Sequence, residues 1–128
     1  MDRIPKLRMV AAVVLVVCVC STLTLAAKPN WQRFWSQFSE AVNKKDGVAL
    51  KSLMTSERDF FDGGGGGSRD QWIQMMFRES NWQELRKSVA SGTMPHPDAQ
   101  GSSRITKDRF LIFSVVNGRW RFVGVMGD

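Results

Sequence analysis

Between residues 31 and 42 the hydrophobic positions of the chain recur with the period of an α-helix. The apolar residues fall at i, i+3, i+4, i+7, i+10 and i+11, and they are Trp31, Phe34, Trp35, Phe38, Ala41 and Val42. Polar residues occupy most positions between them, which predicts an amphipathic helix with one continuous apolar stripe. Asn30 precedes the stripe and is a typical N-cap residue. The large aromatic side chains indicate that this helix covers a broad surface such as a curved sheet.

Three further helices are expected before residue 93. Asp46, Ser68 and Asn81 are each a suitable cap at the start of one of them, and the last is expected to end near Gly92. Their apolar residues are Val48, Ala49, Leu50, Leu53 and Met54, then Trp72, Ile73, Met75, Met76 and Phe77, then Trp82, Leu85 and Val89. Residues 59–62, between the second and third helices, predict a short strand.

Residues 63–67 are five consecutive glycines. Such a tract has high backbone entropy and no side chain to bury, which predicts a flexible loop. The alternative is a phosphate-binding loop, but no Lys-Ser or Lys-Thr pair follows, and a dinucleotide fingerprint would have a third glycine where Ser68 stands. A second loop is expected over residues 93–103, where Pro, Gly, Ser and Asp predominate.

The chain from Arg104 onward predicts a β-hairpin around Asn117-Gly118, a strong signal for a two-residue type I′ turn. Pairing outward from this turn sets Val116 opposite Arg119, Val115 opposite Trp120, Ser114 opposite Arg121, Phe113 opposite Phe122, Ile112 opposite Val123, Leu111 opposite Gly124 and Phe110 opposite Val125. Side chains alternate across a strand, so Val115, Phe113, Leu111, Trp120 and Phe122 share a core face, on which Gly124 leaves a gap. The other face is polar near the turn and apolar further away, so another surface is expected to cover its apolar part.

The first 27 residues form a separate unit. Arg3, Lys6 and Arg8 precede twelve apolar residues, 9–20, and small residues end the segment at Ala26-Ala27. This order is typical of a secretory signal peptide, so we expect export to a bacterial periplasm or secretion. The alternative is an uncleaved anchor in the inner membrane, with the domain facing the periplasm, because residues 9–27 approach the length of a membrane span. A lipoprotein is less favoured, because valines precede the two cysteines.

Composition changes the picture once the leader is set aside. The whole chain has 18 basic and 12 acidic residues, a net charge of +6, whereas residues 28–128 have 15 and 11, a net charge of +4, and no cysteine. Two cysteines, one histidine and no tyrosine exclude a Cys/His zinc site, a disulfide framework and a tyrosine acid. No metal or cofactor is expected. The remaining 101 residues or so suffice for one domain.

The aromatic helix, the second helix after Asp46-Gly47 and the terminal hairpin together resemble the NTF2-like superfamily, including its SnoaL-like and ketosteroid-isomerase-like groups. The likeness rests on Trp31-x-x-Phe34-Trp35-x-x-Phe38, continued by Ala41-Val42-Asn43-Lys44-Lys45-Asp46, and on Asn117-Gly118-Arg119-Trp120-Arg121-Phe122. The resemblance implies an α+β fold over residues 28–128, with N-terminal helices packed on a bent antiparallel sheet that ends in a C-terminal β-hairpin. In this cone the helices cover the concave side of the sheet.

The resemblance also implies two places where molecules meet. The outer face of the sheet pairs subunits in that family, which suggests a homodimer through Phe110, Ile112, Val123 and Val125. The concave side holds either a ligand pocket for a small apolar molecule or simply the core, and its residues are Trp31, Trp35, Phe38, Trp72, Phe113, Trp120 and Phe122.

Little in the sequence supports catalysis. Asp59 and Asp62 flank two phenylalanines, and a carboxylate beside aromatic rings can act as a general base, as in an isomerase or cyclase. His96 lies between two prolines and is a weaker candidate, because Asp98 does not readily face it. The arginines of the hairpin lack an aromatic platform, which argues against nucleic acid. We therefore expect non-enzymatic binding of a small apolar ligand or a protein partner, with a cone-fold enzyme as the alternative.

Overall fold

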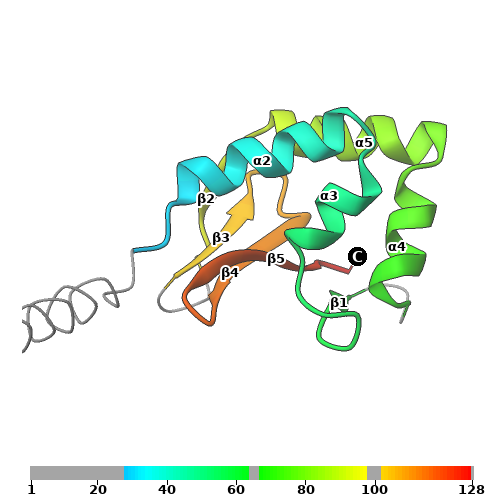
Figure 1. Ribbon diagram of the computed structural model, residues 1–128. Helices are drawn as coiled ribbons and strands as arrows, with labels where there is room; N and C mark the ends of the chain where they lie inside the picture. Colours follow the sequence, from blue (N-terminus) through cyan, green and yellow to red (C-terminus); the bar gives the residue numbers. More distant parts are fainter. Residues whose placement is uncertain (1–27, 64–66, 98–101, 128) are drawn as a thin grey trace, which may run out of the picture.

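The computed structural model describes residues 28–63, 67–97 and 102–127, which form an α+β domain with four helices packed on a five-stranded sheet (Figure 1). The elements in chain order are α2 (Trp31–Asn43), α3 (Gly47–Ser52), β1 (Phe61–Asp62), α4 (Arg69–Met76), α5 (Glu79–Ala90), β2 (Thr93–Pro95), β3 (Ser103–Thr106), β4 (Leu111–Val116) and β5 (Arg119–Val125). The predicted α+β class is confirmed. The predicted leader, residues 1–27, and most of the predicted flexible loop, residues 64–66, lie outside the described residues.

The strands follow the order β1-β5-β4-β3-β2 across the sheet. All neighbours are antiparallel except β1 and β5, so the sheet is mixed and the prediction of a purely antiparallel sheet is wrong at this edge. Strand β2 is a second correction, because Thr93–Pro95 was expected to be a loop. Its alternation is too short to be recognised, and pairing with β3 supplies the strand geometry.

Three helix starts are those that the capping residues predict. The Asn30 side chain accepts a hydrogen bond from the Arg33 N–H at 3.0 Å, and Asp46 accepts one from the Ala49 N–H at 3.0 Å. Ser68 begins α4 with a full capping box. The fourth prediction is wrong, because α5 begins at Glu79, and Asn81 instead donates its side-chain N–H to the Met75 carbonyl at 3.0 Å.

The hairpin register is confirmed from the turn to Phe113 opposite Phe122, and Asn117 and Gly118 both have the positive φ of a type I′ turn, 51° and 77°. Beyond that pair the register shifts, so that Ile112 lies opposite Gly124 and Leu111 opposite Val125. Val123 is the extra residue of this bulge. The shift moves Val125 onto the core face, where it is 3% exposed, and removes Gly124 from that face.

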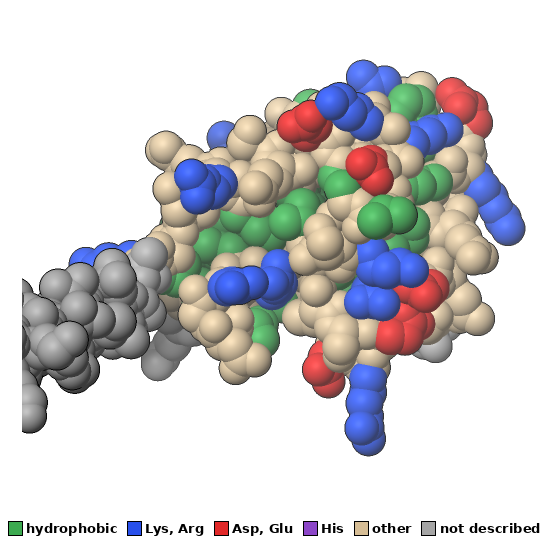
Figure 2. Space-filling model, in the orientation of Figure 1, with side chains coloured by type: hydrophobic (Ala, Val, Ile, Leu, Met, Phe, Trp, Pro, Cys, Tyr) green, Lys and Arg blue, Asp and Glu red, His purple; other side chains and the backbone are tan. Residues whose placement is uncertain are grey.

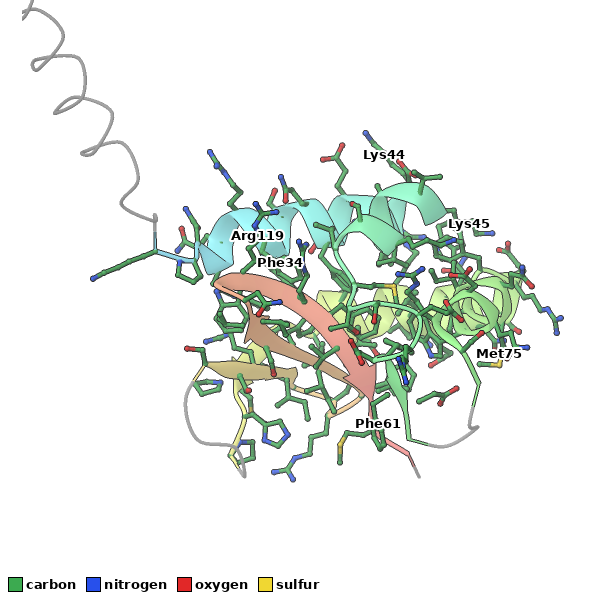
Figure 3. The ribbon with its side chains drawn as sticks, turned by 60° about the horizontal axis from the view of Figure 1, so that its bottom comes forward. Phe34, Lys44, Lys45, Phe61, Met75 and Arg119 are labelled. Carbon is green, nitrogen blue, oxygen red and sulfur yellow. The ribbon has the colours of Figure 1, made fainter. Side chains whose placement is uncertain are left out.

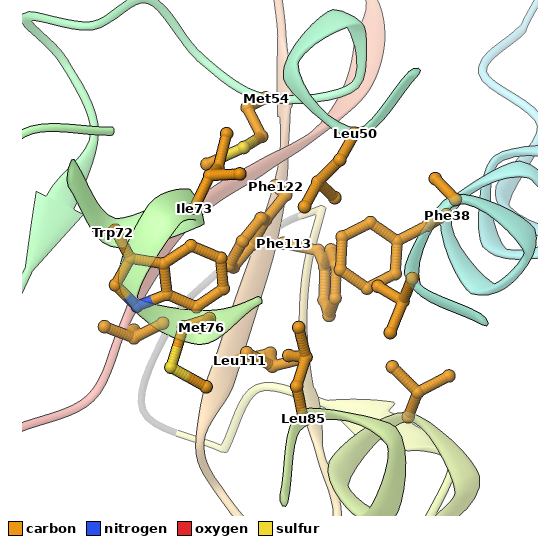
Figure 4. Close-up of a cluster of buried hydrophobic side chains, with 14 of the residues drawn as sticks. Phe38, Leu50, Met54, Trp72, Ile73, Met76, Leu85, Leu111, Phe113 and Phe122 are labelled. Carbon is orange, nitrogen blue, oxygen red and sulfur yellow. The ribbon is translucent and has the colours of Figure 1, made fainter. Parts of the chain in front are cut away.

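Aromatic rings from helices and strands fill the space between α2, α4 and the sheet (Figure 4). Phe122 lies at the centre, with ring centroids 5.2 Å from Phe38 and 5.2 Å from Trp72. Phe38 and Phe113 meet edge to face at 5.0 Å. Two residues expected on buried helix faces are instead exposed, Val48 at 84% and Met75 at 42%.

Candidate functional site

The three residues considered for catalysis do not meet. Asp62 belongs to β1 at one edge of the sheet, whereas His96 follows β2 at the other edge. Four strand spacings separate the two edges, or about 19 Å. Asp59 is exposed, accepts a hydrogen bond from the Ser56 hydroxyl at 2.8 Å, and lines a different cleft from Asp62. Asp98, the other half of the considered His96 pair, lies outside the described residues.

The aromatic residues that could have formed either a pocket or a core form the core. Phe38, Trp72, Phe113 and Phe122 are buried, and Trp31, Trp35 and Trp120 are half-buried at its edge. The edge residues pack against one another, with Trp31 4.7 Å from Trp120 and 5.5 Å from Trp35 between ring centroids. Their side chains therefore occupy the volume that a ligand would need.

The four residues predicted to form an interface separate into three environments. Val125 is buried in the core, so its placement on the outer face is wrong, and the bulge is the reason. Phe110 packs against the core and lines a cleft described below. Ile112 and Val123 are half-buried. Ile112 belongs to an apolar row of laterally paired residues that crosses all five strands and consists of Met94, Ile105, Ile112, Gly124 and Phe61.

An apolar cleft of about 440 Å³ lies between β1, α4 and the last described residues. It is lined by Asp62, Gly67, Gln71, Trp72, Met75, Met76, Phe110, Val125, Met126 and Gly127. Trp72, Met76 and Val125 are buried in its floor, whereas Met75 and Met126 are 42% and 45% exposed at its rim. Figure 3 shows Met75 and Phe61 on the same side of the molecule, at the ends of α4 and β1.

Local structure explains how these side chains come together. Trp72, Met75 and Met76 are spaced i, i+3 and i+4 on α4, so they lie on one side of the helix. The C-terminal segment is held beside them, because the Met126 N–H donates to the Phe110 carbonyl at 2.9 Å and the Gly63 N–H donates to the Val125 carbonyl at 3.2 Å.

Phe61 extends this apolar surface beyond the cleft. Its side chain is 60% exposed, and its ring lies 3.0 Å from the position that a Cβ on Gly63 would take, which is 2.6 Å from the Gly127 nitrogen at the rim. Gly124 allows β1 to lie close to β5, because a Cβ at position 124 would be 2.5 Å from the Phe61 carbonyl oxygen. The exposed Met75 and Met126 thus line the cleft, and the exposed Phe61 lies next to it, beside Gly63.

The polar groups of the cleft have limited chemistry. Asp62 is the single charged residue among the described residues that line it. The Gln71 side chain accepts from the Ser68 N–H at 3.2 Å and so completes the capping box of α4. Within the described residues, no group of three His, Cys, Asp or Glu side chains is placed to hold a metal ion.

The strongest electrostatic cluster lies outside the cleft, between α3 and the start of α4. Lys51 Nζ is 3.2 Å from Asp70 Oδ1, and Arg69 Nε is 3.2 Å from the same oxygen. The hydrogen bond from Lys51 lowers the pKa of the Asp70 carboxyl, and bonds with Glu57 and Arg69 act in the same direction. This cluster joins two helices and does not reach the cleft residues.

Sequence reasoning did not find the cleft, although two signals pointed toward it. Phe60-Phe61 in a strand must place one ring inside and one outside, because side chains alternate. Phe60 is buried and Phe61 is exposed, as that alternation requires. Met75 and Met76 are adjacent on a helix and point in different directions, so the two side chains are not both expected to be buried.

Comparisons with known proteins add no assignment to these observations. Among the helices of residues 28–63, 67–97 and 102–127, none is both long and apolar enough to cross a membrane. No family model, no curated protein and no solved structure matches the chain.

Proposed function

We propose that the protein is a non-enzymatic binding domain that takes a small apolar molecule in the cleft between β1 and α4. The observation that carries this proposal is that the exposed Met75 and Met126 lie at the rim of a floor of buried apolar side chains. A volume of about 440 Å³ suits a small ligand, since such sites usually measure about 300–1,000 Å³. Methionine side chains adapt their shape, which suits them to an apolar binding surface.

Binding is better supported than catalysis by an isomerase or cyclase. A reaction of that kind needs a carboxylate base and a second polar group that act on the same substrate. Asp62 and Asp59 line different clefts, and the side-chain oxygen of Gln71 already caps α4. The cleft therefore offers apolar contact area beside one carboxylate among the described residues, that of Asp62.

An uncharged fluorescent dye, Nile red, tests the proposal. We expect saturable binding with enhanced emission, and at least tenfold weaker binding in the double variant Met75→Glu/Met126→Glu, which makes the rim polar. The control is Val48→Glu/Val116→Glu, which places the same charges on exposed residues outside the cleft, 84% and 37% exposed. Equal binding by both double variants would overturn the proposal.

A second role, self-association through the outer face of the sheet, is favoured by the apolar row that ends at Phe61. Ile105 of this row is 2% exposed within the chain, so the part open to a partner is the end at Phe61, which is 60% exposed. Native mass spectrometry is expected to show a dimer that Phe61→Glu dissociates and Val116→Glu does not. A monomer at high protein concentration would overturn this role.

Export and the NTF2-like cone complete the proposal. The sequence of residues 1–27 supports export, and mass spectrometry of the protein from its own source tests it, since recovery of these residues would exclude cleavage. The register shift between β4 and β5 is a bulge, and bulges bend strands, which is a feature that a cone requires and so supports this part of the proposal. An experimental structure with a flat sheet would exclude it.

A further inference from the structure

A broad groove of about 940 Å³ lies at the end of the domain where α2 begins. One wall is the segment that leads into α2 together with its first turns, and the other is the turn between β4 and β5. Its lining residues are Lys28, Pro29, Asn30, Arg33, Phe34, Gln37, Leu53, Asn117, Gly118, Arg119, Trp120 and Arg121. Figure 3 shows Phe34 and Arg119 close to each other at this end of the molecule.

The groove is positively charged, and none of the acidic residues that the structure describes lines it. Its cations are Lys28, Arg33, Arg119 and Arg121. The ion pairs between described residues all involve other cations, Lys44, Lys45, Lys51, Arg69 and Lys87. Arg121 donates to the Ser52 carbonyl at 2.9 Å, whereas Lys28, Arg33 and Arg119 are exposed to water.

Apolar side chains lie between these cations. Phe34 and Trp120 line the groove, and Trp120 is half-buried against Trp31. Figure 2 shows Lys and Arg side chains on both sides of an apolar strip at this end of the molecule. Cations around a half-buried indole are found on protein surfaces at the boundary between water and lipid, where the ring lies at the level of the headgroups.

The position of the groove along the chain indicates what it meets. Lys28, one of its lining residues, directly follows residues 9–27, the segment that the sequence predicts to enter a membrane as a signal peptide or an anchor. Whenever that segment is held in a bilayer, Lys28 is at the surface of the membrane. The other cations of the groove line the same surface of the domain as Lys28.

We propose that this groove docks onto the phosphate headgroups of an anionic membrane. The proposal is independent of the ligand cleft, which lies at the opposite end of β5. Each cation close to an anionic bilayer is expected to strengthen docking by roughly fivefold at ordinary ionic strength. Removing three of them therefore weakens docking by about a hundredfold, and high salt has a similar effect.

Amide hydrogen exchange of the full chain in lipid nanodiscs tests the proposal. Discs of phosphatidylcholine alone and discs with added phosphatidylglycerol hold residues 9–27 equally, so a difference between them reports on the domain. We expect slower exchange over residues 28–37 and 117–121 in the anionic discs only. The triple variant Lys28→Gln/Arg33→Gln/Arg119→Gln is expected to remove this protection, and it leaves the Arg121 hydrogen bond in place.

The matched control is Arg58→Gln/Arg78→Gln/Lys107→Gln, which removes the same charge from exposed residues outside the groove. Protection that persists in the control and is lost in the groove variant supports docking. Equal protection in both kinds of disc, or equal loss in the two triple variants, would overturn it. Protection by millimolar inorganic phosphate without any bilayer would show that the groove binds free phosphate and would overturn the membrane as its partner.

Discussion

At the scale of single residues, Asp108 connects polar groups from separate parts of the fold. Its carboxylate accepts hydrogen bonds from the hydroxyl groups of Ser88 and Thr106, the latter at 2.6 Å, and from the Phe110 N–H at 3.2 Å. Ser88 and Thr106 are 4% and 0% exposed. Asp108 therefore ties the end of α5 to the turn between β3 and β4.

We expect Asp108→Ala to lower the free energy of unfolding by about 2 kcal/mol, because two buried hydroxyl groups lose their acceptor. Urea unfolding followed by circular dichroism measures this loss. Asp59→Ala is the control, since Asp59 bonds only an exposed serine in the contacts described above. A loss of less than about 0.5 kcal/mol for Asp108→Ala would show that water replaces the carboxylate at no cost.

Asp70 gives the fold a dependence on pH. Its pKa lies below the ordinary value of 3.8, first because of the hydrogen bond from Lys51. A carboxyl group whose pKa is lower in the folded state stabilises the fold above its unfolded pKa, and this contribution is lost as the pH falls through the folded pKa. Asp70→Asn is therefore expected to be less stable than the wild type at pH 7.

The same reasoning predicts that the two proteins converge in stability as the pH is lowered from 7 toward 2, because the carboxyl group becomes protonated in the folded state as well. Urea unfolding at both pH values measures the difference. In a Lys51→Gln background the effect of Asp70→Asn at pH 7 is expected to shrink, because the main cause of the pKa shift has been removed. A difference that stays constant between pH 7 and pH 2 would contradict this account.

At the scale of elements, the fold could be predicted where a local signal sets the geometry. Asn30, Asp46 and Ser68 begin helices because each satisfies a free backbone N–H within three residues. Asn117-Gly118 sets the register of the hairpin through its own backbone, since both residues adopt the positive φ that the turn requires. These signals act within a few residues, so the sequence shows them directly.

The register shift in β5 could not be predicted from alternation, because it depends on a partner distant in the chain. Gly124 lies opposite Phe61 of β1, and its missing side chain lets the two backbones approach. A glycine inside a strand does suggest a bulge or a close approach, but it does not identify the partner. The cleft was missed for the same reason, since Val125 and Phe110 reach it only after the shift.

The close approach leads to a prediction for Gly124→Ala. The new Cβ would lie 2.5 Å from the Phe61 carbonyl oxygen and 2.9 Å from its Cβ, so β1 must move away from β5. We expect a loss of about 1–3 kcal/mol and faster exchange of the Gly63 N–H, which donates to Val125.

Gly47→Ala is the matched control, because its nearest neighbours would be side-chain atoms at 3.6 and 3.8 Å, ordinary contact distances. Its helical position is expected to leave stability unchanged or to raise it by up to about 1 kcal/mol. If Gly124→Ala exchanged the Gly63 N–H at the wild-type rate, the pairing of β1 with β5 would not depend on the missing side chain.

At the scale of the whole molecule, one aromatic ring connects two groups of rings. Phe38 and Phe113 belong to the group beneath α2, and Phe60 and Trp72 to the group beside α4. Among the ring contacts of the described residues, those two groups meet only at Phe122, with centroid distances of 5.2–5.5 Å to each of these four rings. Because residues 28–128 contain no cysteine, packing of this kind holds the domain without disulfides.

Phe122→Ala is therefore expected to lower the free energy of unfolding by about 3–5 kcal/mol, a large part of the 5–15 kcal/mol typical of a small domain. Denaturation followed by tryptophan fluorescence and by circular dichroism measures both the loss and its cooperativity. The wild type is expected to unfold in one transition with both signals, since its two ring groups share Phe122. Val48→Ala, at a position 84% exposed, is the control and is expected to change stability by less than about 0.5 kcal/mol. A loss below about 1 kcal/mol for Phe122→Ala would show that the two ring groups are stable without the ring that joins them.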